Sequence, residues 1–65
     1  MRITLNGQPI NTEQTTLEGL LIEQGYTDCA VATAVNTDFV AAANRAECLL
    51  SEGAAIDVVA PMQGG

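Results

Sequence analysis

The sequence predicts an α+β fold in which a mixed sheet of four to five strands carries one main helix packed on one face. The first observation is a tight strand, turn and strand at the N-terminus, followed directly by an amphipathic segment with helical spacing. The second is a set of short strand-like segments after that helix, which a right-handed crossover would place in the same sheet. Because 65 residues leave room for one domain, we expect it to cover residues 1–60, with a flexible tail at 61–65.

The N-terminal segment predicts a β-hairpin. Residues 1–5 alternate between apolar and polar side chains, which is typical of a half-buried strand. Asn6-Gly7 predicts a two-residue type I′ turn, because these two residues tolerate the positive φ that both central positions require. The return strand, residues 8–13, contains Pro9, which cannot donate to a ladder, so we expect it at a sheet edge.

The next segment predicts the main helix. Thr15 to Glu18 fit a capping box, in which the Thr15 hydroxyl accepts from the amide of residue 18 and Glu18 reaches back to the Thr15 amide. Gly25 is expected to end the helix in the left-handed conformation. The apolar stripe that we expect in the core consists of Leu17, Leu20 and Leu21.

A third strand is expected at residues 30–35. Its β-branched residues Val31, Thr33 and Val35 share one face, and its alanines share the other, where small side chains would let a helix approach. A turn at 36–38 precedes a short extended segment at Phe39-Val40.

The C-terminal third predicts one more strand. Residues 41–47 are expected to be irregular, since they allow barely one or two helical turns. The final strand covers 55–60, with Ile56 and Val58 on one face, and Pro61 ends it. This order of elements is that of the β-grasp fold.

The charge balance excludes several classes of partner. Two arginines stand against eight acidic residues, for a formal net charge of −6, so neither nucleic acid nor an anionic membrane is an expected partner. The chain has no His and no Lys, and therefore no imidazole base and no Schiff-base amine. We expect a protein that is not itself an enzyme.

Two cysteines are too few, and too widely spaced, for a zinc site, so no metal is expected. No signal peptide or spanning segment is apparent at the N-terminus, which predicts a cytoplasmic, reducing setting. Cys29 and Cys48 are most simply free thiols that pack. The alternative, a persulfide or transient disulfide acceptor, needs a nearby cation, which Arg45 could supply to Cys48.

The whole chain resembles the ThiS family, the ubiquitin-like sulfur carriers of thiamine biosynthesis. The resemblance rests on the Asn6-Gly7 hairpin, the Thr-Leu-x-x-Leu-Leu helix at 16–21, the Ala-Val-Asn strand end at 34–36, and the terminus Val-Ala-Pro-Met-Gln-Gly-Gly at 59–65. Where family members often have Gly, a Pro-Arg pair and Asp, this chain has Thr37, Ala41-Ala42 and Ala54.

The resemblance implies a reaction at the last residue. The Gly65 carboxylate would be adenylated by a ThiF-like, E1-like enzyme that uses ATP, then converted to a thiocarboxylate that supplies sulfur to a ThiG-like thiazole synthase. A cysteine desulfurase or sulfurtransferase would provide the sulfur, and no cofactor would be bound by the carrier itself. Gly64, Gln63 and Met62 would thread into the partner active sites, where residues without Cβ let the backbone approach closely.

Three other functions remain open from the residues alone. The same chemistry could serve molybdopterin synthesis, the chain could be a ubiquitin-like protein modifier, or it could be a plain β-grasp binding module. A partner interface near the tail is expected from Val59 and Phe39 together with Met62, with the alternative that each of these side chains faces the core. The late acidic residues Glu47, Glu52 and Asp57 either steer the chain toward basic partners or simply form a solvated surface.

Overall fold

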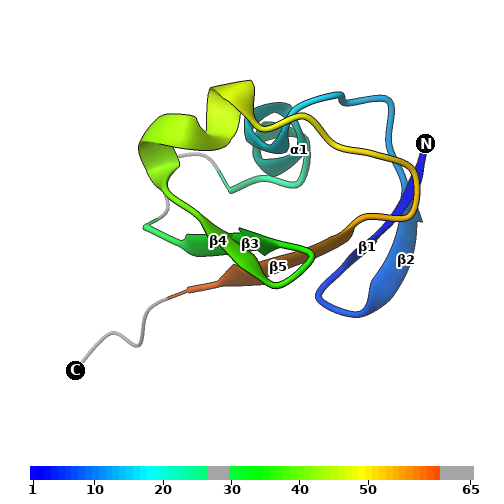
Figure 1. Ribbon diagram of the computed structural model, residues 1–65. Helices are drawn as coiled ribbons and strands as arrows, with labels where there is room; N and C mark the ends of the chain where they lie inside the picture. Colours follow the sequence, from blue (N-terminus) through cyan, green and yellow to red (C-terminus); the bar gives the residue numbers. More distant parts are fainter. Residues whose placement is uncertain (27–29, 61–65) are drawn as a thin grey trace.

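Five strands form one mixed sheet in the order β2-β1-β5-β3-β4, in a computed structural model that describes residues 1–26 and 30–60. The pairing of β1 with β5 is parallel and the other three pairings are antiparallel, as predicted for a mixed sheet. Both helices lie on one side of the sheet (Figure 1). The elements are β1 (Arg2–Leu5), β2 (Gln8–Asn11), α1 (Leu17–Glu23), β3 (Ala32–Val35), β4 (Asp38–Val40), the 3-10 helix η1 (Ala42–Glu47) and β5 (Ala55–Val59).

The N-terminal hairpin has the predicted turn and the predicted place. Asn6 and Gly7 have φ angles of 51° and 82°, as a type I′ turn requires, and Leu5 pairs with Gln8 on either side of them. The Pro9 strand, β2, lies at the sheet edge, which confirms the prediction from its missing N–H.

The N-cap of α1 lies one residue later than predicted. The Thr16 hydroxyl accepts from the Gly19 N–H at 3.1 Å, so the expected capping box between Thr15 and Glu18 is wrong. The reason is tertiary: the Thr15 carbonyl accepts from the Leu50 N–H at 2.8 Å, which holds this segment extended against the chain that follows η1. With Thr16 as the cap, the third helical position is Gly19, which has no side chain to reach back.

The C-terminus of α1 ends at glycine as predicted. Gly25 has a φ of 85°, and its N–H donates to the Ile22 carbonyl at 3.1 Å. The Tyr26 N–H donates to the Leu21 carbonyl at 2.8 Å, which completes a Schellman motif.

The face of β3 that meets the helix is the β-branched one, not the alanine one. Thr33 is buried and pairs with the buried Val58, whereas Ala32 is exposed. The expectation that alanines would face the helix is therefore wrong, because packing the larger side chains inward buries more apolar area. The alanines instead lie on the side of the sheet away from α1, which we call the outer face.

Residues 42–47 form the 3-10 helix η1 rather than the predicted irregular segment. Local propensity alone would not hold so short a helix. The Arg45 side chain supplies the tertiary contact, because it donates to the Thr33 hydroxyl at 3.1 Å and to the Val31 carbonyl at 2.6 Å. Since β4 ends at Val40, opposite Thr33, that arginine replaces the strand neighbour that the Val31 carbonyl lacks.

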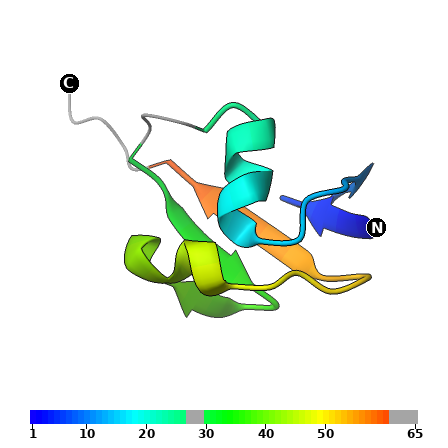
Figure 2. The same ribbon diagram turned by 90° about the horizontal axis from the view of Figure 1, so that it is seen from above.

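The core lies between the sheet and α1. Figure 2 shows α1 crossing over the sheet with η1 beside it. The predicted stripe of α1 is buried, and so are the inward residues of β5. The buried apolar residues are Ile3, Leu17, Leu20, Leu21, Leu50, Ala54, Ile56 and Val58. Neither helix in the described part of the chain has the length and apolar character needed to cross a membrane.

Candidate functional site

The strand that leads toward the Gly-Gly segment is held on both sides. β5 lies between β1 and β3, and its last residue, Val59, pairs with Ala32. On the parallel side, the Asn6 N–H donates to the Ile56 carbonyl at 2.8 Å. Residue 59 is therefore fixed by the middle of the sheet, and residues 60–65 follow directly from it in the sequence.

Two turn asparagines extend the ladders of β5. The Asn6 Oδ1 accepts from the Val58 N–H at 2.8 Å, and the Asn36 Oδ1 accepts from the Ala55 N–H at 2.9 Å. Each asparagine sits at the first position of a hairpin turn, with a φ of 51° in both cases. In both hairpin turns, the asparagine side chain thus accepts a hydrogen bond from a backbone amide of β5.

The outer face carries an exposed apolar group over β3, β4 and β5. Phe39 is 72% exposed and Val59 is 61% exposed. Phe39 pairs with Ala34 and Val59 with Ala32, so all four residues lie on one face by strand alternation. We call these four residues, Ala32, Ala34, Phe39 and Val59, the outer patch. The two small alanines separate the two large side chains.

The predicted interface residues are thus found on the same face, and neither packs in the core. Sequence reasoning had left open whether Phe39 and Val59 point inward, and their exposure shows that they do not. The role of these two residues in docking stays a prediction. The remaining predicted site residues, Met62, Gln63, Gly64 and Gly65, lie outside the described residues, as does the expected tail.

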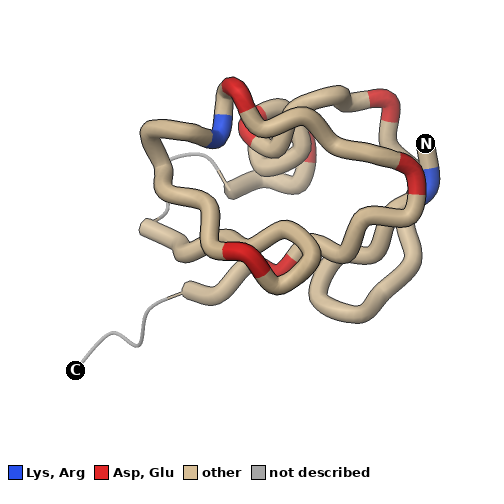
Figure 3. Tube along the Cα trace, in the orientation of Figure 1, with Lys and Arg blue, Asp and Glu red and all other residues tan. Residues whose placement is uncertain are grey.

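The acidic residues that lie close in sequence are separated in space. Glu47 belongs to η1, Asp57 belongs to β5, and Glu52 accepts from the Arg2 amide at 2.9 Å near the N-terminus. Figure 3 shows acidic positions on several sides of the molecule. Sequence reasoning did not single out Asp57, although it is the member of this group on the outer face.

Cys48 is half-buried and packs against the core as a free thiol. The Arg45 guanidinium, which the reactive alternative needed as a nearby cation, donates instead to β3. These contacts favour the packing role for Cys48. Cys29 lies outside the described residues.

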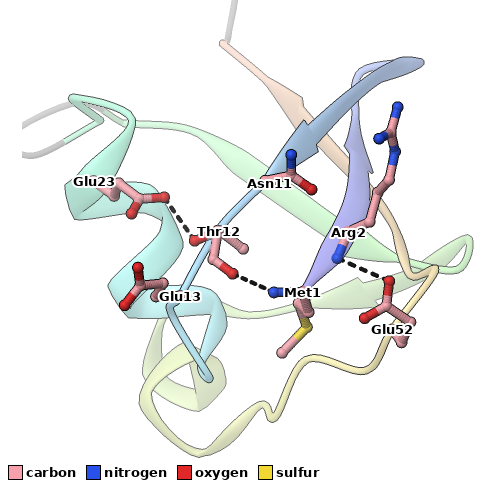
Figure 4. Close-up of a pocket in the computed structure, with 7 residues that line it drawn as sticks. All are labelled: Met1, Arg2, Asn11, Thr12, Glu13, Glu23 and Glu52. Atoms are coloured by element: carbon pink, nitrogen blue, oxygen red, sulfur yellow. Dashed lines mark hydrogen bonds between the residues drawn. The ribbon is translucent and has the colours of Figure 1, made fainter.

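A cavity of about 490 Å³ lies near the N-terminus, lined by Met1, Arg2, Asn11, Thr12, Glu13, Glu23 and Glu52. Its polar groups bind one another: the Thr12 hydroxyl donates to Glu23 at 2.7 Å, and the terminal ammonium of Met1 donates to the Thr12 carbonyl at 2.6 Å (Figure 4). Figure 1 shows this end of the sheet far from the end of β5. Within residues 1–26 and 30–60, no group of three His, Cys, Asp or Glu side chains could hold a metal ion.

Comparisons with known proteins agree with the fold. The sequence model of the ThiS family matches residues 3–65. Among solved structures, the thiamine biosynthesis protein ThiS from Geobacter metallireducens superposes with a TM-score of 0.85 at 20% sequence identity, and all of each chain is covered. No curated protein sequence matches the chain. The family match over nearly the whole chain, on a five-stranded β-grasp sheet, shows that this protein belongs to the ThiS family of sulfur carriers in thiamine biosynthesis.

Proposed function

We propose that this protein carries sulfur as a thiocarboxylate on Gly65. In the first step the carboxylate oxygen attacks the α-phosphorus of ATP in a ThiF-like, E1-like enzyme, and pyrophosphate leaves. The outer sulfur of a persulfide, supplied by a cysteine desulfurase or sulfurtransferase, then attacks the acyl carbon and displaces AMP to give an acyl disulfide. A second thiol of the partner attacks the inner sulfur, which forms a protein disulfide and releases the thiocarboxylate. The thiocarboxylate supplies its sulfur to a ThiG-like thiazole synthase.

The family match over residues 3–65 is the observation that carries this proposal. The chain's own residues support a role as carrier rather than as catalyst. A terminal carboxylate with an ordinary pKa of about 3.5 is ionised at neutral pH and needs no base to become a nucleophile. The chain has neither His nor Lys, so we assign the acid and base steps to the partner enzymes.

The anchoring of β5 supports the proposed threading of the Gly-Gly end. Val59 is held by pairing with Ala32, so the segment that follows it begins at a fixed position relative to the sheet. Five residues follow Ala60, and a fully extended chain spans at most about 3.3–3.6 Å per residue, or roughly 17 Å in all. We propose that Met62, Gln63 and Gly64 cross a channel of about that depth. Because Gly64 and Gly65 have no Cβ, the backbone can approach the nucleotide closely.

We also propose the outer patch as the surface that the activating enzyme grips. Phe39 and Val59 expose apolar area on the face that leads to the Gly-Gly segment, and a partner that covers them gains the free energy of removing that area from water. Truncation of Phe39 to Ala should therefore weaken binding to the adenylating enzyme while the sheet stays folded, since the side chain packs on nothing in the core.

Intact mass measurement tests the chemistry. The protein is incubated with the ThiF-like enzyme, ATP and a sulfur donor, and the expected result is a gain of about 16 Da, the difference between oxygen and sulfur. The control omits ATP and should show no gain. A variant with one alanine appended after Gly65 should also show none, and conversion of that variant without removal of the extra residue would refute the proposal.

The same protein preparation separates the alternatives. Transfer of sulfur into a molybdopterin precursor, and not into thiazole, would replace the thiamine pathway with that one. Stable conjugates to target proteins without a thiocarboxylate intermediate would indicate a protein modifier. Normal function in cells after deletion of Gly65 would leave only a binding module.

A further inference from the structure

One carboxylate stands apart from the others by its position on the sheet. In β5 the residues before and after Asp57, Ile56 and Val58, are buried, so strand alternation places Asp57 on the outer face. It is exposed, it pairs with Ala34 of the outer patch, and it precedes Val59 by two residues on the same strand. Asp57 therefore adjoins the outer patch.

The other described carboxylates lie elsewhere. Asp38 is on β4, which β3 separates from β5, and it adjoins Phe39 in sequence, so strand alternation places it on the opposite face of the sheet, where it pairs with Val35. The rest belong to the N-terminal cavity, to α1 or to η1: Glu13, Glu23, Glu52, Glu18 and Glu47. Among residues 1–26 and 30–60, Asp57 is thus the carboxylate of the outer face.

Neither arginine of the chain lies in place to neutralise Asp57. Thr4 of β1 pairs with Ala55 of β5, and Arg2 lies two residues before that pair whereas Asp57 lies two residues after it, so their backbones are about 13 Å apart along the strands. The Arg45 guanidinium donates to Val31 and to Thr33, on the helix side. The charge of Asp57 is left to solvent in the free protein.

We propose that Asp57 is a specificity-determining residue, which pairs with an arginine or lysine side chain of the adenylating enzyme when that enzyme covers the outer patch. The inference rests on the proposed function. A partner that covers Phe39 and Val59 also removes water from Asp57, because the carboxylate lies beside the same alanines. Burying a carboxylate without a counter-charge is strongly unfavourable, so a partner without a cation there is rejected.

The proposal fixes the chemistry of the partner surface. That partner surface has an apolar recess for the Phe39 ring and one cation beside the recess. The distance between recess and cation is set by the sheet, because Phe39 and Asp57 pair with Ala34 from its two sides and so lie two strand spacings apart. A guanidinium suits the site best, since it can bind a carboxylate through two parallel hydrogen bonds and stack on an aromatic ring.

The test compares two substitutions that remove the same charge from opposite faces of the sheet, Asp57 on β5 and Asp38 on β4. Dissociation constants for the ThiF-like adenylating enzyme of the same organism are measured by calorimetry at low and at high salt. Asp57→Asn keeps the side-chain shape and should weaken binding by at least about 30-fold, since it leaves the partner's cation buried and unpaired. Asp38→Asn changes the net charge equally on the other face and should change the dissociation constant by less than about twofold.

The salt dependence gives a second readout. Binding of the wild-type protein should weaken as salt is raised, and Asp57→Asn should lose part of that dependence, whereas Asp38→Asn should keep it. Equal effects of the two substitutions would show general attraction between an acidic protein and a basic partner, and would overturn the inference.

Phe39→Ala separates this inference from the proposed function. Weaker binding of Phe39→Ala with unchanged binding of Asp57→Asn would leave the outer patch as the docking surface and overturn the pairing of Asp57. Failure of the wild-type protein to gain about 16 Da in the complete reaction would instead overturn the proposed function, and the inference with it.

Discussion

The second hairpin turn contains a residue that its backbone conformation disfavours. Thr37 has a φ of 72°, in the left-handed region, at the position where the first hairpin has Gly7 with a φ of 82°. Both turns link strands paired directly at their ends, Leu5 with Gln8 and Val35 with Asp38. A β-branched side chain in the left-handed region is a steric outlier, and it is tolerated only because the surrounding pairing imposes the turn.

The cost can be worked out from this comparison. A residue other than glycine in the left-handed region costs about 1–3 kcal/mol, and glycine loses about 0.4–1 kcal/mol more backbone entropy on folding. Thr37→Gly should therefore raise the free energy of unfolding by about 0.5–2 kcal/mol. A gain of about 1 kcal/mol raises the Tm of a domain of this size by roughly 4–8 °C.

Urea unfolding monitored by circular dichroism measures this change. The midpoint should rise for Thr37→Gly while the slope stays constant, since the surface exposed on unfolding is unchanged. Gly7→Thr is the matched control and should lower stability by a similar amount. A Cβ at Gly7 would meet no atom within 4 Å, so its cost is conformational and not steric crowding. Unchanged or lower stability of Thr37→Gly, with Gly7→Thr destabilising, would refute the argument.

Three further substitutions test single contacts by urea unfolding. Asn6→Gly keeps the turn conformation but removes the Oδ1 that accepts from a β5 amide, and a loss of about 1–3 kcal/mol is expected; equal stability would mean that water replaces the acceptor. Thr16→Ala should cost about 1 kcal/mol and Thr15→Ala much less, while the reverse order would restore the cap first predicted. Arg45→Met keeps the side-chain stem but leaves the Val31 carbonyl unpaired, which should lower the free energy of unfolding by about 1–3 kcal/mol and speed amide exchange in β3. Unchanged exchange would show that the hydrogen bond from Arg45 to Val31 does not stabilise β3.

The parts of the fold that local chemistry determines could be predicted. Asn6-Gly7 predicts its own turn because few other residue pairs tolerate the required φ angles, and Gly25 predicts the helix end for the same reason. Alternation along residues 55–59 predicts which side of β5 is buried, since the period of a strand is two.

The parts of the fold that depend on contacts between distant segments could not be predicted from the sequence. Thr15 and Thr16 are equally good caps by sequence, and the hydrogen bond from Leu50 to the Thr15 carbonyl decides between them. The structure of 42–47 depends on the Arg45 contact with β3, which no local pattern contains.

The candidate site shows the same division. Its Gly-Gly segment is visible in the sequence, whereas the outer patch is assembled by register. Phe39 lies opposite Ala34, and Val59 lies opposite Ala32, because of how β3 pairs with two different strands. Three residues of β4 are too few for alternation to indicate which of its side chains point outward.

The central place of β5 in the sheet has a consequence for folding during synthesis. Among the strands of residues 1–26 and 30–60, β5 leaves the ribosome last, yet it joins the hairpin β1-β2 to the hairpin β3-β4. Until residues 55–59 emerge, the two halves share no strand ladder, so the sheet closes only after nearly all of the domain has been synthesised. A nascent chain stalled before β5 should remain open to protease, and the strand that precedes the Gly-Gly segment thus also completes the fold.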